Sequence, residues 1–173
     1  RLPSVRAAPQ TRNGIGVERR GRVHEQRQRT HGPMSRGPEN NFISSVHKHL
    51  PMKLYRMKNN NPYNSGIADV WYSGKGRDLW IEYKFIEVPK RPDTTIDLVS
   101  GKSPEISALQ QEWLRARHEE GRNVGVIIGS KDGGVWLPGL AWNQTFQAKD
   151  FLACLRTRKE LAEEIIREVQ GHG

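Results

Sequence analysis

The sequence predicts a single α/β domain over residues 34–173, in which helices flank a mixed β-sheet. Three observations predict this fold: helix-period segments alternate with short β-branched or aromatic runs, a hairpin signal joins two of these runs, and the last segment is an amphipathic helix. The predicted order is helix, three strands, helix, strand and C-terminal helix. A chain of 173 residues is long enough to bury a substantial core.

The first half of the domain is expected to hold one helix and three strands. Pro38 is favoured in the first turn of a helix, and the apolar positions within 42–50 form one face that ends before Pro51. The run KLYRMK is typical of a short strand. Two more strands are expected around 67–72 and 79–86, because SGKG between them is typical of a hairpin turn.

The second half is expected to begin with a Pro-containing loop over 87–102. A helix follows from Ser103 to about Gly121, then the strand NVGVIIGS and a tight turn, KDGG, into VWLPG. The segment TRKE at 157–160 is a capping box that starts the C-terminal helix. The apolar positions of the helix from Ser103 include Ile106, Leu109 and Trp113.

The formal charge of +9 is unevenly spread along the chain. Residues 1–33 hold eight Arg and two Glu, a net of +6, and lack apolar periodicity, so we expect a disordered basic extension there. A basic balance suggests an anionic partner such as nucleic acid. No apolar run approaches the ~20 residues that span a bilayer. The single cysteine, Cys154, fits a reducing setting, and we expect a cytoplasmic protein.

Three charged residues stand inside the two hairpin strands. If Lys75 and Gly76 form the turn, paired positions sum to 151, and Asp69 and Glu82 also sum to 151. Directly opposed side chains lie about 4.5–5.5 Å apart at Cβ, so two carboxylates there repel each other. Period 2 places Lys84 on the same face as Glu82. The second strand is otherwise apolar on both faces, which predicts a central strand.

A divalent cation would relieve this repulsion, and Mg²⁺ is typically held by one or two carboxylates with phosphate and water. Lys84 would then orient an attacking water or offset negative charge on a phosphate. The alternative is a surface hairpin with an ordinary Glu82–Lys84 ion pair and Asp69 at its solvated end. The apolar flanks of both strands favour the metal site.

Several segments together resemble the PD-(D/E)XK nuclease superfamily, within it the VRR-NUC-like and phage junction-resolvase-like branches. GIADV is similar to the family's G-x-P-D segment, with Ala68 in place of proline, and WIEYK is similar to its hydrophobic-(D/E)-x-K strand. ISALQQEWL resembles its S-x-x-Q-x-x-W/F-L helix, and PENNFISSVHKHLP resembles its first helix. The resemblance covers roughly residues 38–130 and implies a restriction-endonuclease-like αβββαβ core.

The resemblance also implies a site and a cofactor. It implies that Asp69, Glu82 and the backbone carbonyl of Tyr83 hold Mg²⁺ or Mn²⁺. It also implies that Lys84 serves the attacking water and that Glu39 and Gln110 support these residues. Glu39 has a second interpretation, as a first-turn glutamate that the helix dipole favours. Gln110 is otherwise an exposed helix residue, with Gln111 as the functional one.

The expected function is divalent-metal-dependent DNA endonuclease activity, and the resemblance to branches often seen in phages implies a phage-encoded protein. One alternative is a structure-selective Holliday-junction-type resolvase, which would act as a homodimer. Another is a non-catalytic nucleic-acid-binding or interaction module on an inactive nuclease fold. A nucleotide cofactor is not expected, because Ile96 stands where the phosphate-binding loop ending in GKS needs glycine.

Candidate DNA contacts lie in the loop before Asp69 and at the hairpin tip. Cations, amides and a tyrosine there suit a phosphate backbone, although such segments are also typical of solvated turns. These candidates are Lys58, Asn60, Asn61, Tyr63, Lys75 and Arg77.

Overall fold

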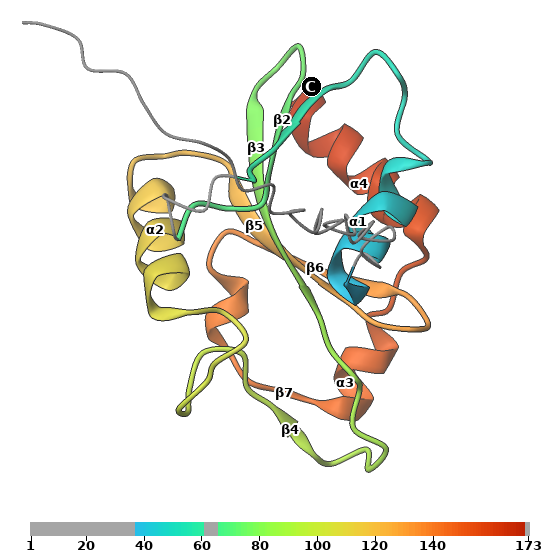
Figure 1. Cartoon of the computed structure of the whole chain (residues 1–173), viewed down its shortest axis with the longest axis vertical. Coiled ribbons are helices and arrows are strands. Elements are labelled where there is room, and N and C mark those ends of the chain that lie inside the picture. Colours follow the sequence, from blue (N-terminus) through green and yellow to red (C-terminus); the bar gives the residue numbers. More distant parts are fainter. Residues whose placement is uncertain (1–36, 61–65, 172–173) are drawn as a thin grey trace, which may run out of the picture. The chain divides into compact units, whose positions relative to one another are not determined.

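The computed structural model describes residues 37–60 and 66–171. In this part of the chain helices cover both faces of a five-stranded mixed sheet, as predicted (Figure 1). The helices are α1 (Pro38–His47), α2 (Ala108–Glu119), α3 (Ala148–Ala153) and α4 (Arg158–Gln170), with the 3-10 helix η1 (Ala141–Asn143). The strands are β1 (Tyr55–Lys58), β2 (Val70–Ser73), β3 (Asp78–Phe85), β4 (Thr95–Ile96), β5 (Val124–Gly129), β6 (Gly134–Pro138) and β7 (Phe146–Gln147). None of the described helices is both long and apolar enough to cross a membrane.

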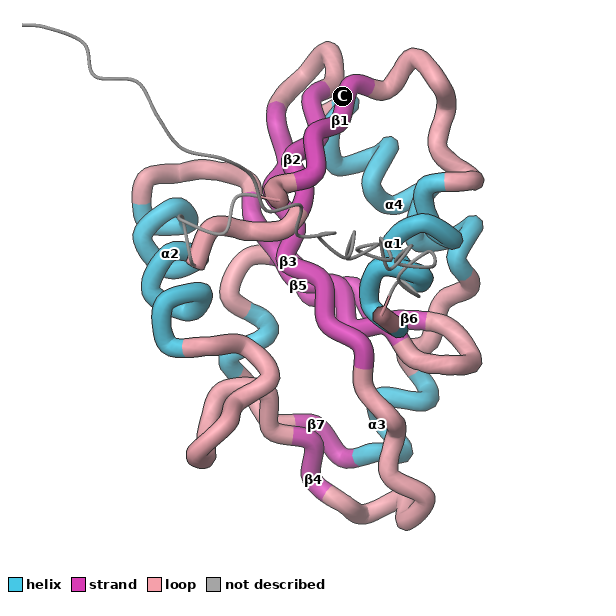
Figure 2. The backbone as a smooth tube through the Cα atoms, in the orientation of Figure 1, coloured by secondary structure: helices cyan, strands magenta, loops and turns pink. Residues whose placement is uncertain are grey.

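The main sheet has the strand order β1-β2-β3-β5-β6 (Figure 2). Strand β3 is central, as its two apolar faces predict. It runs parallel to β5 and antiparallel to β2, and the other pairs in this sheet are antiparallel. The crossover from β3 to β5 contains α2, which explains how two parallel strands become neighbours.

The hairpin register agrees with the prediction. Val70 pairs with Ile81 and Ser73 with Asp78, and both pairs sum to 151. The Gly74 N–H donates to the Arg77 carbonyl over 3.3 Å, which closes the turn. Continuing the ladder by one position places residue 69 opposite residue 82, at the point where β2 begins.

Two hydrophobic cores lie on the two faces of the sheet. Helices α1 and α4 pack side by side over one face, and α2, η1 and α3 cover the other (Figure 1). Phe42 fixes α1 to the sheet, because it occupies a notch left by the paired glycines Gly129 and Gly134. A Cβ at these two positions would lie 2.6 and 2.9 Å from the Phe42 ring.

The predicted start of α2 was wrong, and some short elements were missed. The helix begins at Ala108 because Ser107, not Ser103, caps it and forms a capping box with Gln110. Ile106 is buried but precedes the helix, and Leu109 is 53% exposed. The missed elements include strands β4 and β7, of two residues each, and helix α3, of six residues. Segments this short show no hydrophobic periodicity in the sequence.

The boundary predicted at residue 34 and the extension over 1–33 lie outside the described residues. Both stay predictions. C-terminal helix α4 begins at the predicted capping box, with Thr157 as its N-cap. Its apolar stripe buries Leu161, Ile165 and Val169 against the sheet.

Candidate active site

Asp69, Glu82 and Lys84 meet on the α2 side of the sheet, where β2 begins beside the middle of β3. Glu82 is 0% exposed, and Lys84 Nζ lies 2.8 Å from Glu82 Oε1 with only 15% of its side chain exposed. The Tyr83 N–H donates to Asp69 Oδ2 over 2.9 Å, which fixes the Asp69 carboxylate beside β3. The three charged side chains are therefore held in place by the hairpin itself.

Helix α2 contributes Gln110 to this group. The side-chain N–H of Gln110 donates to Glu82 Oε1, while its own Oε1 accepts the Ser107 N–H over 2.9 Å. Gln111 points elsewhere and donates to the carbonyls of Val99 and Ile106. Of the two neighbouring glutamines, Gln110 therefore contacts the carboxylate and Gln111 holds the preceding loop. We call Asp69, Glu82, Lys84 and Gln110 the carboxylate centre.

The first turn of α1 lies close to the carboxylate centre. Burial and the neighbouring Asp69 raise the pKa of Glu39, and Lys84 and Lys58 oppose the shift. Lys58 also donates a hydrogen bond to the side chain of Asn40. The sequence analysis missed Asn40, whose only signal is its position directly after Glu39.

Burial dominates the electrostatics of both carboxylates. Burial and, to a smaller extent, the neighbouring Asp69 raise the pKa of Glu82 to about 8, although Lys84 opposes the shift. Burial also raises the pKa of Asp69, against the Tyr83 N–H and Lys84. Burial lowers the pKa of Lys84, but the Glu82 carboxylate reverses that shift.

One oxygen of the carboxylate centre has no hydrogen-bond partner among the described residues. Gln110 and Lys84 both contact Oε1 of Glu82, whereas Oε2 is buried and unpaired in this part of the chain. A buried acceptor left unpaired costs about 1–3 kcal/mol, more when charged. No three His, Cys, Asp or Glu side chains in the described ranges are grouped to hold a metal alone. Two carboxylates with phosphate and water nevertheless suffice for Mg²⁺, so the donors present fit that cation.

The predicted DNA contacts separate into two places. Lys58 and Asn60 line a small pocket with Asn40 and Ser44 near the first turn of α1. Lys75 and Arg77 lie at the hairpin tip, at the opposite end of β2 from the carboxylate centre. Arg77 pairs there with Glu168 of α4 at 3.2 Å. The remaining two candidates, Asn61 and Tyr63, lie outside the described residues.

In metal-free buffer, the raised pKa of Glu82 should make the free energy of unfolding fall as the pH rises from about 4.5 to about 8. The unfolded chain loses this proton near 4.5 and the folded protein near 8, so the folded state binds more protons in that window. His47, whose burial lowers its pKa to about 4, acts with the opposite sign between 4 and 6.5. Denaturant titrations of wild type and Glu82→Gln in EDTA at several pH values measure how much Glu82 contributes to the pH dependence of the free energy of unfolding. An identical pH slope in both proteins would contradict the assignment.

The sequence matches no protein-family model, and none of the curated proteins matches it. Among solved structures, the chain is similar to Hjc, a Holliday junction resolvase of Archaeoglobus fulgidus, an archaeal hyperthermophile. The two chains share 14% sequence identity, with a TM-score of 0.44 over 72% of this chain and 99% of that one. A similarity of this size leaves the function to be argued from the carboxylate centre itself.

Proposed function

We propose that this chain is a divalent-metal-dependent endonuclease that hydrolyses phosphodiester bonds of DNA. The observation that carries the proposal is the fully buried Glu82 carboxylate, which lies next to Asp69 and keeps one oxygen without a hydrogen-bond partner among the described residues. A fold gains nothing in stability from such a group, since a buried carboxylate beside a like charge is costly. Retaining it is typical of a site that binds a cation and does chemistry.

In this proposal Asp69 and Glu82 hold Mg²⁺ or Mn²⁺, with the Tyr83 carbonyl as a further ligand. The cation would polarise the phosphate and lower the pKa of a bound water. Lys84 orients the water and offsets negative charge on the phosphate in the transition state. Gln110 donates to Oε1 of Glu82, which would leave the second oxygen of this carboxylate for the cation. Hydrolysis adds the water oxygen to phosphorus and breaks the bond to one bridging oxygen, which leaves with a proton.

DNA is the proposed substrate because the protein carries +9 at pH 7 and places Lys58 next to the centre. An excess of positive charge on a protein most often binds the phosphate backbone of a nucleic acid. Glu39 in α1 lies close enough to Asp69 and Lys84 for its charge to act on both, which supports its inclusion in the site.

Cleavage assays on three substrates test the proposal. Supercoiled plasmid, linear duplex and a four-way junction are incubated with the purified chain in Mg²⁺, Mn²⁺ or EDTA. We expect cleavage of at least one substrate with either metal and none in EDTA. Tight binding without cleavage of any substrate would instead indicate a non-catalytic DNA-binding module. Preference for the junction, together with a dimer by sedimentation, would favour the resolvase.

A further inference from the structure

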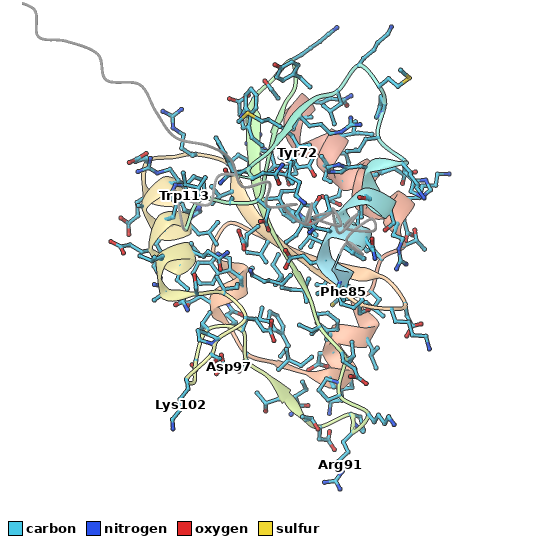
Figure 3. All side chains as sticks on the ribbon, in the orientation of Figure 1. Tyr72, Phe85, Arg91, Asp97, Lys102 and Trp113 are labelled. Atoms are coloured by element: carbon cyan, nitrogen blue, oxygen red, sulfur yellow. The ribbon has the colours of Figure 1, made fainter. Side chains whose placement is uncertain are left out.

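A row of aromatic rings crosses the face of the sheet that carries Glu82. Neighbouring rings are 5.7, 6.2 and 5.4 Å apart between centroids, and the contacts are tilted or edge-to-face. In order, the rings of this aromatic row belong to Tyr55 of β1, Trp71 of β2, Trp80 of β3 and Trp113 of α2. Figure 3 labels Trp113 on its helix. The row therefore joins three neighbouring strands to the helix that holds Gln110.

The outer end of the aromatic row is open to solvent. Tyr55 is 68% exposed, and Met57, which pairs with Trp71 on the same face, is 52% exposed. The three tryptophans are half-buried. Large aromatic and apolar side chains gathered on an accessible surface usually mark a binding site, whereas single ones need no explanation.

The aromatic row adjoins the carboxylate centre. Trp80 precedes Glu82 by two residues on the same face of β3, a separation of about 7 Å along the strand. Trp113 follows Gln110 by three residues, so the two side chains share one face of α2. A ligand that lies on the Trp80 ring is therefore only two residues of β3 away from Glu82 of the carboxylate centre.

A cleft of about 1130 Å³ opens beside the inner end of the row, between the hairpin tip, the C-terminal end of α2 and the turn after β6. Trp80 and Trp113 form part of its wall. The cleft is lined by four cationic side chains, one histidine and one carboxylate, which are Lys75, Arg77, Arg117, Arg122, His118 and Asp78.

Two of these cations are available for a ligand. Arg77 pairs with Glu168 and Arg117 with Glu120, and the Arg117 guanidinium also lies 5.9 Å from the Trp113 ring centroid. By contrast, neither Lys75 nor Arg122 has an ion pair within the described part of the chain. The cleft thus combines ring faces with positive charge that no ion pair among the described residues neutralises.

We propose that the aromatic row and this cleft bind a single-stranded segment of DNA beside the carboxylate centre. Its unpaired bases stack on Tyr55 and on the accessible parts of the tryptophan rings, and its phosphates contact Lys75 and Arg122. Single-stranded nucleic acid is the occupant because rings and cations in one groove match its bases and phosphates, whereas the bases of a duplex are already stacked. The inference rests on the proposed function in one respect, that the bound strand belongs to the DNA that is cut.

Binding without cleavage tests the site by fluorescence anisotropy in EDTA. The probes are a labelled oligothymidine of about 16 nucleotides and a blunt duplex of equal length. We expect wild type to prefer the single strand. Tyr55→Ala and Trp113→Ala should each weaken that binding at least about fivefold, while Tyr55→Phe, which keeps the ring, stays within about twofold. Leu152→Ala, which removes an exposed apolar side chain from α3, is the control and should bind as wild type.

Charge is tested separately by the salt dependence of the same binding. Replacing both Lys75 and Arg122 by Ala should reduce the log–log salt slope by about 1.4, or about 0.7 for each lost phosphate contact. Lys159→Ala, an exposed lysine of α4, should leave the slope unchanged. Equal single-strand affinity in wild type, Tyr55→Ala and Trp113→Ala would overturn the inference. So would a Tyr55→Ala variant that alters only the sedimentation coefficient, because the row would then be an interface between copies.

The two proposals fail in different ways. Cleavage in Mg²⁺ by a protein whose DNA binding ignores the rings would overturn the single-strand site and leave the nuclease. Ring-dependent binding of the oligothymidine by a protein that cuts nothing would overturn the nuclease and leave the site. If both proposals hold, a substrate with an unpaired segment should be cut faster than a blunt duplex, and Tyr55→Ala should remove that difference.

Discussion

Replacing Glu82 by glutamine is expected to slow metal-dependent DNA cleavage by at least about 100-fold. Glutamine preserves the volume of the side chain and can still accept hydrogen bonds from Gln110 and Lys84. It cannot carry the negative charge that the proposed metal requires. Asp69→Asn should have an effect of similar size, because Asp69 is the opposed carboxylate.

Single-turnover cleavage at saturating protein measures this loss without interference from product release. A second readout is the thermal midpoint with and without Mg²⁺, which should rise for wild type and stay constant for Glu82→Gln. The control is Glu163→Gln, which removes an exposed carboxylate of α4 and should change neither quantity. Cleavage at the wild-type rate by folded Glu82→Gln would refute the assignment of the centre.

Replacing Phe42 by alanine is expected to lower the free energy of unfolding by about 3–5 kcal/mol. Phe42 is buried, and its ring fills the notch at Gly129 and Gly134 that anchors α1. Gly129→Ala should cost about 1–3 kcal/mol, because its Cβ would lie 2.6 Å from the same ring. The double variant should lose less than the sum, since the new methyl group occupies space that the ring has vacated.

Urea denaturation of the two single variants and the double variant measures this coupling. Glu163→Ala, which truncates an exposed side chain of α4, is the control and should change stability by less than about 0.5 kcal/mol. Strict additivity of Phe42→Ala and Gly129→Ala would mean that the ring and the glycine do not share one space.

The sequence predicted best where interactions are local. The hairpin has period 2 and a short turn, so arithmetic alone gave the register that opposes Asp69 and Glu82. The start of α2 was missed because Ser103-Pro104 and Ser107 both resemble helix caps. Only the reciprocal bonds between Ser107 and Gln110 distinguish them. The same bonds fix the rotation of α2 and therefore select Gln110 over Gln111, which sequence spacing cannot do.

Contacts between distant elements were beyond the sequence patterns. The aromatic row depends on the register in which β1 pairs with β2. The sequence of the long segment between these strands does not predict that register. The notch for Phe42 needs α1 to dock across β5 and β6, more than 80 residues later in the chain. Lys75 and Arg77 lie at the hairpin tip, as predicted, yet the cleft that they line does not include Asp69 or Glu82.

The carboxylate centre draws on both hydrophobic cores. Glu39 depends on α1, which belongs to one core, and Gln110 depends on α2, which belongs to the other, while the hairpin between them carries Asp69 and Glu82. Damage to either core therefore dismantles the same few side chains. If the proposed function holds, partly unfolded forms of the chain would keep these residues but lose their geometry, so chains that have yet to finish folding would not cut DNA.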